Sequence, residues 1–160
     1  KDLHGRKNMY YQVNCTYYSA LGESDKKLLL ARAIQLFMPG KPQVWYLDLF
    51  AGKNDYEAVK KGHKEINRTN LTWDQILEGL KKKVVRQQLT LLRFRNTFPV
   101  FGFDAEVKAD NSEKQILKIT WEKNGYRAFL EADLKTYDFR IDAFDKSGSS
   151  VFSFSSENDV

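Results

Sequence analysis

Cysteine and long apolar runs are scarce in this sequence, and each shortage excludes a class of protein. Cys15 is the single cysteine among 160 residues, so no internal disulfide can form and we expect a reducing compartment, the cytoplasm. The longest apolar runs, such as Leu28 to Ala31, hold about four residues, against the roughly 20 that a membrane helix needs. We therefore predict no membrane span.

Histidine is equally scarce, which bears on metal binding. His4 and His63 are the two histidines, and Cys15 lies between them at no spacing typical of zinc. The segment 51–55 begins Ala-Gly-Lys but lacks the second glycine and the Gly-Lys-Ser/Thr ending of a phosphate-binding loop. We predict neither a metal site nor a resident cofactor.

The charge of the chain is basic but dispersed. Twenty-six Lys and Arg against 21 Asp and Glu give a net charge of +5. A nucleic-acid-binding protein usually concentrates such charge on one face. The one dense run, Lys81 to Lys83, would spread around a helix instead. We predict no nucleic-acid partner.

The pattern of apolar residues, which make up 42% of the chain, changes near Pro99. Before it, apolar residues recur at three- and four-residue spacing over 25–38 and 74–96, which predicts two helices. Between them, the apolar run 44–49 is typical of a buried strand, interrupted by Asp48. Helix, strand, long loop and helix is the order of an α/β barrel or a doubly wound sheet.

After Pro99 the apolar residues alternate with polar ones. This period of two, from about residue 101 to 155, predicts a small antiparallel sheet of four or five strands. Asn124-Gly125 is the strongest hairpin signal, because both central positions of a type I′ turn need a positive φ.

Two loop segments stand out as candidate binding sites. Residues 51–71 form a long loop, and loops of that length in compact domains are usually functional. Within it, Arg68 could hold a ligand with its rigid fork of donors, or form a salt bridge inside the loop. Residues 9–18 carry four tyrosines and two amides, including Tyr11 and Gln12, which suits a polyhydroxy ligand as well as a packed hinge.

Five blocks of the sequence, in order and at similar spacing, resemble sucrose phosphorylases of the α-amylase superfamily. The blocks are residues 11–22, 31–44, 51–55, 66–68 and 92–96. The resemblance implies the last part of a (β/α)₈ TIM barrel over residues 1–98, with the acceptor loop, the seventh helix, the eighth strand and the eighth helix. A small C-terminal antiparallel β domain over 101–155 would follow. Because a whole barrel needs about 250 residues, we expect this chain to be a fragment that is inactive alone.

The resemblance also implies a reaction and a site. A retaining α-glucoside phosphorylase forms a covalent glucosyl-enzyme, which phosphate attacks to give α-glucose 1-phosphate. The resemblance places the catalytic carboxylates upstream of Lys1, so we assign no catalytic residue here. Arg68 resembles the arginine that binds the glucosyl unit, and Tyr11 and Gln12 resemble residues that serve the leaving sugar and phosphate.

The acceptor sugar stays open at this point. Sucrose phosphorylases carry an acidic residue two positions before the matching tyrosine, and Met9 stands there instead, without charge-assisted hydrogen bonds to fructose. Fructose, fructose 6-phosphate, glycerate and glycerol are the alternatives. The expected partners are a small α-glucoside, phosphate as co-substrate and the rest of the barrel, with a homodimer also open. An α-glucosidase-type hydrolase and a non-catalytic carbohydrate-binding module are the rival hypotheses.

Overall fold

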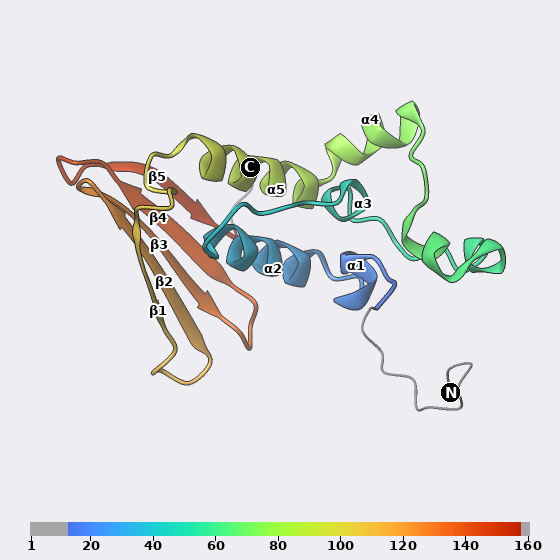
Figure 1. Cartoon of the computed structure of the whole chain (residues 1–160), viewed down its shortest axis with the longest axis horizontal. Coiled ribbons are helices and arrows are strands. Elements are labelled where there is room, and N and C mark those ends of the chain that lie inside the picture. The colour runs from blue at the N-terminus through green and yellow to red at the C-terminus, as the bar shows by residue number, and fades with distance from the viewer. Residues whose placement is uncertain (1–12, 158–160) are drawn as a thin grey trace.

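The computed structural model of the chain describes residues 13–157, in which helical segments precede an antiparallel sheet (Figure 1). The α-helices are α1 (Tyr17–Ala20), α2 (Asp25–Phe37), α3 (Tyr46–Leu49), α4 (Trp73–Lys81) and α5 (Lys83–Thr97). Two 3₁₀ helices, η1 (Ala58–Lys61) and η2 (His63–Asn67), lie in the loop between α3 and α4. The strands are β1 (Glu106–Asp110), β2 (Ile116–Lys123), β3 (Tyr126–Asp133), β4 (Phe139–Phe144) and β5 (Ser150–Ser155).

The sheet is a meander in which each strand pairs antiparallel with the next, in the order β1-β2-β3-β4-β5. Asn124 (φ 51°) and Gly125 (φ 83°) form the two-residue turn between β2 and β3, as predicted from the sequence. The alternation begins later than we expected, because residues 98–105 form turns that end before β1. Phe101 therefore packs into the core, whereas Phe103 is exposed.

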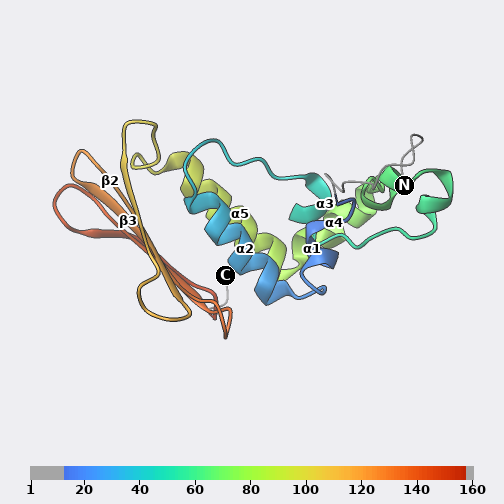
Figure 2. The same ribbon diagram turned by 60° about the horizontal axis from the view of Figure 1, so that its bottom comes forward.

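Helices α2 and α5 lie side by side against one face of the sheet (Figures 1 and 2). The Ser24 side chain caps α2 by accepting from the Lys27 N–H, and Thr72 and Gln75 form a capping box at the start of α4. The buried face of the sheet and the apolar stripes of the two helices share one core. Its largest fully buried apolar side chains are Trp121, Phe37, Leu28, Leu91, Leu130 and Ile141.

An aromatic cluster joins the end of the helices to the sheet. The Trp121 indole N–H donates to the Phe37 carbonyl at 2.8 Å. The Phe94 ring of α5 stacks on Phe152 of β5 with centroids 4.1 Å apart, and the Arg95 guanidinium lies 4.2 Å from the Phe101 ring centroid. Stacking and cation–π contacts thus add to area burial at this junction.

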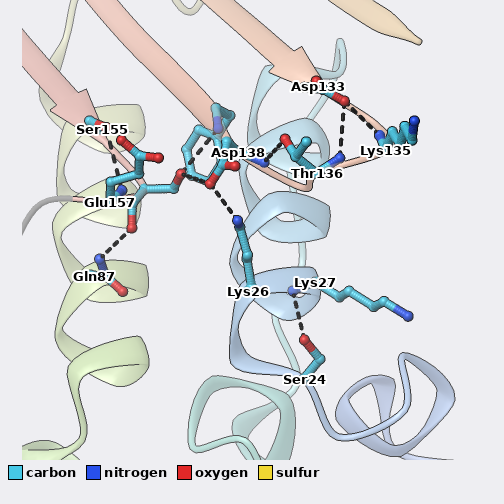
Figure 3. Close-up of polar contacts among 12 residues, drawn as sticks. Ser24, Lys26, Lys27, Gln87, Asp133, Lys135, Thr136, Asp138, Ser155 and Glu157 are labelled. Atoms are coloured by element: carbon cyan, nitrogen blue, oxygen red, sulfur yellow. Dashed lines mark hydrogen bonds and ion pairs between the residues drawn. The ribbon is translucent and has the colours of Figure 1, made fainter.

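A second set of polar contacts ties the other end of α2 and α5 to the sheet (Figure 3). The Lys26 ammonium of α2 lies 2.7 Å from the Asp138 carboxylate, and the Gln87 amide of α5 donates to the Ser156 carbonyl at 3.5 Å. Asp133 accepts from the backbone N–H groups of Lys135 and Thr136 and so fixes the turn before β4. The helix pair is therefore held to the sheet along its length.

Two sequence predictions need correction. Residues 44–49, expected as the eighth strand, form an extended stretch followed by α3, and the Leu49 and Phe50 N–H groups donate to the carbonyls of Trp45 and Tyr46. A parallel strand needs at least one partner strand for its ladder of hydrogen bonds, and residues 13–157 supply none there. Short helical hydrogen bonds satisfy the backbone instead.

The expected single helix over 74–96 is broken at Lys82, whose ψ of 134° is extended. Gly79 lowers the helix propensity just before the break. Its missing side chain also admits the Phe50 ring, because a Cβ there would lie 2.5 Å from Phe50 Cδ1. None of the helices in residues 13–157 is long and apolar enough to cross a membrane.

Candidate functional site

The candidate site lies beyond the N-terminal ends of α2 and α5, on the side away from the sheet, where α1, α3 and the loop with the two 3₁₀ helices lie (Figures 1 and 2). Three of the sequence blocks singled out above meet here: residues 13–22, 51–55 and 66–68. They lie far apart in sequence, and side chains of the later two blocks bind the backbone of the first.

Backbone groups of three consecutive residues are each bound by a side chain from residues 48–67. The Thr16 N–H donates to Asn54 Oδ1 at 2.7 Å, and the Tyr17 N–H donates to Asp48 Oδ1 at 2.7 Å. Asn67 Nδ2 donates to the carbonyl of Cys15 at 3.1 Å. We call Asp48, Asn54 and Asn67 the clamp residues. They fix the path of the chain at the start of α1.

Further contacts reinforce the same junction. The Asn54 N–H donates to Ser19 Oγ at 3.0 Å, and Lys53 pairs with Glu23 at 2.5 Å. The hydrogen bond from Lys53 lowers the pKa of the Glu23 carboxyl below its ordinary value. This pair is exposed, so the part-buried amide contacts contribute more to holding the segment.

The loop that carries Arg68 is anchored on both sides of that residue. The Trp45 indole donates to the Asn67 carbonyl at 3.1 Å, and the Tyr46 hydroxyl donates to the Thr69 carbonyl at 2.7 Å. Asp55 accepts from the Thr69 hydroxyl at 3.3 Å. The backbone at Arg68 therefore has little freedom.

The Arg68 side chain is 53% exposed, and its Nη1 lies 3.7 Å from Glu65. An exposed pair at that distance contributes little stability, so the fork of donors stays accessible to a ligand. Tyr11 and Gln12, the other two predicted site residues, lie outside the described residues. The structure places their chain neighbours, from Val13 onward, on the same side as the Arg68 loop through the Asn67–Cys15 bond.

An open pocket of about 710 Å³ with a mixed polar and apolar lining lies beside the clamp, and its residues include Cys15, Tyr17, Arg32, Gln35, Trp45 and Asp48. Arg32 is 1% exposed and donates through Nε to Gln88 Oε1 at 3.0 Å and through Nη1 to Gln35. Its Nη2 has no partner among residues 13–157.

Burial shifts the pKa values of two charged groups in this pocket, Asp48 and Arg32. Burial raises the pKa of Asp48, and the Tyr17 N–H and the Arg32 charge oppose that rise. Burial also lowers the pKa of Arg32. In both groups the loss of hydration on burial disfavours the charged form.

Sequence reasoning did not find the clamp. Asp48 was visible as the one polar residue in an apolar run, and Asn54 and Asn67 lie inside the resembling blocks. No signal in the sequence showed that their side chains bind residues 15–17. Among residues 13–157, no three His, Cys, Asp or Glu side chains gather as metal ligands would.

Comparison with known proteins identifies the relatives of the chain. No family model matches it. A sucrose 6(F)-phosphate phosphorylase from Ilumatobacter coccineus is 52% identical over 141 residues, which cover 86% of the chain and 27% of that enzyme. This chain is homologous to the C-terminal part of sucrose phosphorylase-like enzymes. The resemblance inferred from the five blocks is confirmed.

A sucrose phosphorylase from Agrobacterium vitis is 41% identical over 91% of the chain and 29% of that enzyme. The crystal structure of sucrose 6F-phosphate phosphorylase from Thermoanaerobacter thermosaccharolyticum matches 90% of the chain with a TM-score of 0.82 and 45% identity, and covers 29% of that enzyme. The predicted fold class, the end of a (β/α)₈ barrel followed by a small antiparallel β domain, is thereby confirmed. The chain spans between a quarter and a third of the length of these relatives.

Proposed function

We propose that this chain forms part of an α-glucoside phosphorylase that cleaves its substrate with phosphate by a retaining double displacement. The observation that carries the proposal is the 52% identity to a sucrose 6(F)-phosphate phosphorylase over 86% of the chain. The geometry supports it, because the three blocks of the proposed site come together at one end of the molecule.

We assign sucrose 6(F)-phosphate as the preferred substrate, with fructose 6-phosphate as the leaving sugar. Two relatives named sucrose 6(F)-phosphate phosphorylase are 52% and 46% identical to the chain, whereas the sucrose phosphorylase of Agrobacterium vitis is 41% identical. We call residues 9–18 the acceptor segment. Met9 brings no negative charge to it, so Met9 does not repel a sugar phosphate as a carboxylate would. Residues 1–8 carry three basic side chains, Lys1, Arg6 and Lys7, against the single acidic Asp2.

Each site residue has a role in this scheme. Arg68 binds the glucosyl unit, since its guanidinium keeps its charge at any working pH and offers several fixed donors. Tyr11 and Gln12 exchange between hydroxyls of the leaving sugar and oxygens of the incoming phosphate. The nucleophile and the acid/base carboxylates come from the part of the barrel that precedes these residues in the relatives.

Phosphate is the co-substrate, and the reaction needs no organic cofactor. We place the enzyme in the cytoplasm, where phosphate and sugar phosphates are available and the single thiol of Cys15 stays reduced. Phosphorolysis rather than hydrolysis distinguishes this proposal from an α-glucosidase-type enzyme of the same superfamily.

The test is an assay of the full-length enzyme with phosphate and a panel of four substrates: sucrose, sucrose 6(F)-phosphate, glucosylglycerol and glucosylglycerate. We expect α-glucose 1-phosphate from sucrose 6(F)-phosphate with the highest kcat/KM. Release of glucose without glucose 1-phosphate would defeat phosphorolysis and favour a hydrolase.

A substitution of Arg68 sharpens the same test. Arg68→Lys keeps the charge but loses the fork of donors, so we expect kcat/KM to fall about 100-fold or more for every substrate of the panel, a transition-state loss of about 2.7 kcal/mol. Arg86→Lys, on the exposed side of α5, is the matched control and should leave the kinetics unchanged. Equal kinetics for both variants would remove Arg68 from the site.

A further inference from the structure

We propose that Asp48, Asn54 and Asn67 are positioning residues that hold the acceptor segment in the conformation that phosphate needs. The inference rests on the proposed function, because it assigns the clamp a role in choosing phosphate over water. It goes beyond Arg68, Tyr11 and Gln12, which touch the substrate directly in that scheme.

The clamp binds the chain close to the two proposed substrate-binding residues, Tyr11 and Gln12. Cys15 lies three residues after Gln12 and four after Tyr11, and a residue spans at most about 3.6 Å of chain. The backbone at residues 15–17 therefore fixes the point from which the segment that carries Tyr11 and Gln12 extends. Thr16 is 1% exposed and its side chain also caps α1, so this part of the chain cannot relax independently.

The bonds of the clamp cannot be replaced by solvent without cost. Thr16 is buried, and a buried backbone N–H left without a partner costs about 1–3 kcal/mol. Loss of one clamp side chain therefore favours a different path of residues 13–17 over the present one.

One clamp asparagine accepts a hydrogen bond and the other donates one, so the same substitution should affect them differently. Asn54 accepts through Oδ1, whereas Asn67 donates through Nδ2. Asn54→Asp keeps an acceptor oxygen for the Thr16 N–H. Asn67→Asp sets a carboxylate oxygen against the Cys15 carbonyl, so a hydrogen bond becomes a repulsion. The same chemical change should preserve the clamp at one position and open it at the other.

The expected readout is the ratio of glucose 1-phosphate to glucose formed by the full-length enzyme from sucrose 6(F)-phosphate at fixed phosphate. Attack by water on the glucosyl-enzyme needs no acceptor segment in place, whereas attack by phosphate does. We expect Asn67→Asp to lower the ratio at least tenfold and to raise the KM for phosphate. Asn54→Asp should stay within about threefold of the wild type, and the exposed Asn96→Asp on α5 should leave the ratio unchanged.

Hydrogen exchange in the same variants supplies a readout that does not depend on activity. We expect peptides covering residues 13–22 to exchange faster in Asn67→Asp and to exchange at wild-type rates in Asn54→Asp. If both aspartates behave alike in exchange and in the product ratio, the clamp is overturned. If the wild type forms no glucose 1-phosphate while the exchange pattern holds, the clamp stands and the proposed function fails.

Asp48 provides a second pair in case Asn67→Asp does not fold. Asp48→Asn keeps an oxygen acceptor for the Tyr17 N–H, and Asp48→Leu removes it at similar volume. We expect the leucine variant to lower the product ratio at least tenfold and the asparagine variant to restore it. Equal ratios for the two variants would contradict a positioning role for Asp48.

Discussion

The two ends of this molecule are stabilised in different ways. At the sheet end, ladder hydrogen bonds and a continuous aromatic core satisfy the chain within itself. At the loop end, side chains bind the backbone of distant segments, and large aromatic side chains such as Trp73, Tyr56 and Trp45 stay exposed. The sheet end therefore pairs its own backbone groups and buries its own apolar core. The loop end exposes large aromatic side chains, a surface that the rest of a barrel would cover.

The largest effect should come from breaking the junction that completes the sheet end. Trp121→Ala removes a 2% exposed indole and the bond from its N–H to the Phe37 carbonyl. We expect a loss of about 3–5 kcal/mol in the free energy of unfolding, measured by denaturant unfolding of the full-length enzyme. Phe103→Ala, at an 85% exposed position, should change it by less than about 0.5 kcal/mol. Similar losses from both variants would show that the aromatic junction is not a core.

A smaller loss of stability should come from adding a side chain at Gly79, where α4 meets the Phe50 ring. Gly79→Ala places a Cβ 2.5 Å from Phe50 Cδ1. Overpacking costs about 1–3 kcal/mol, and the better helix propensity of alanine opposes it by about 1 kcal/mol. We expect a lower melting temperature of the full-length enzyme.

Gly62→Ala is the control for this change, because its Cβ would meet nothing nearer than Glu65 Cγ at 3.8 Å and its backbone is extended. A melting temperature that is unchanged in Gly79→Ala would mean that the Phe50 ring does not pack against Gly79 as described.

The smallest effect concerns the polar tie between α2 and the sheet (Figure 3). The hydrogen bond from Lys26 lowers the pKa of Asp138 below its ordinary value. The native state therefore binds this proton less readily than the unfolded state, and the stabilisation is present above the unfolded pKa and lost as the pH falls through the folded one. Because both groups are partly exposed, the pair contributes at most about 1 kcal/mol.

Lys26→Met should accordingly lower the melting temperature slightly at neutral pH, and the difference from the wild type should vanish in acid. The measurement is a pair of melting curves at several pH values. A difference that persists below the folded pKa of Asp138 would assign the effect to packing of the lysine stem rather than to its charge.

Local signals in the sequence predicted much of the sheet end and less of the loop end. The period of two and the Asn124-Gly125 turn were sufficient for the sheet, since its strands pair with their sequence neighbours. Ser24 and Thr72, which cap α2 and α4, likewise bind backbone N–H groups only three residues away. These features depend on residues close in sequence, which is why they were predictable.

The remaining features depend on partners that no local pattern reveals. A strand over 44–49 was expected from its apolar residues, but a strand needs neighbours, and α3 forms in their absence. The clamp joins Asn54 to Thr16 and Asn67 to Cys15 across long stretches of chain. Resemblance to the sucrose phosphorylases pointed to the blocks that meet, and the structure supplied the contacts between them.

A crystal structure of the full-length enzyme with phosphate and glucose bound would test the central claim most directly. The claim is that residues 9–18 and the Arg68 loop form one wall of an α-glucoside pocket. We predict that Arg68 donates to the glucose hydroxyls and that Tyr11 and Gln12 lie within hydrogen-bond distance of the phosphate. A structure in which Arg68 points away from the sugar, and Tyr11 and Gln12 from the phosphate, would contradict it.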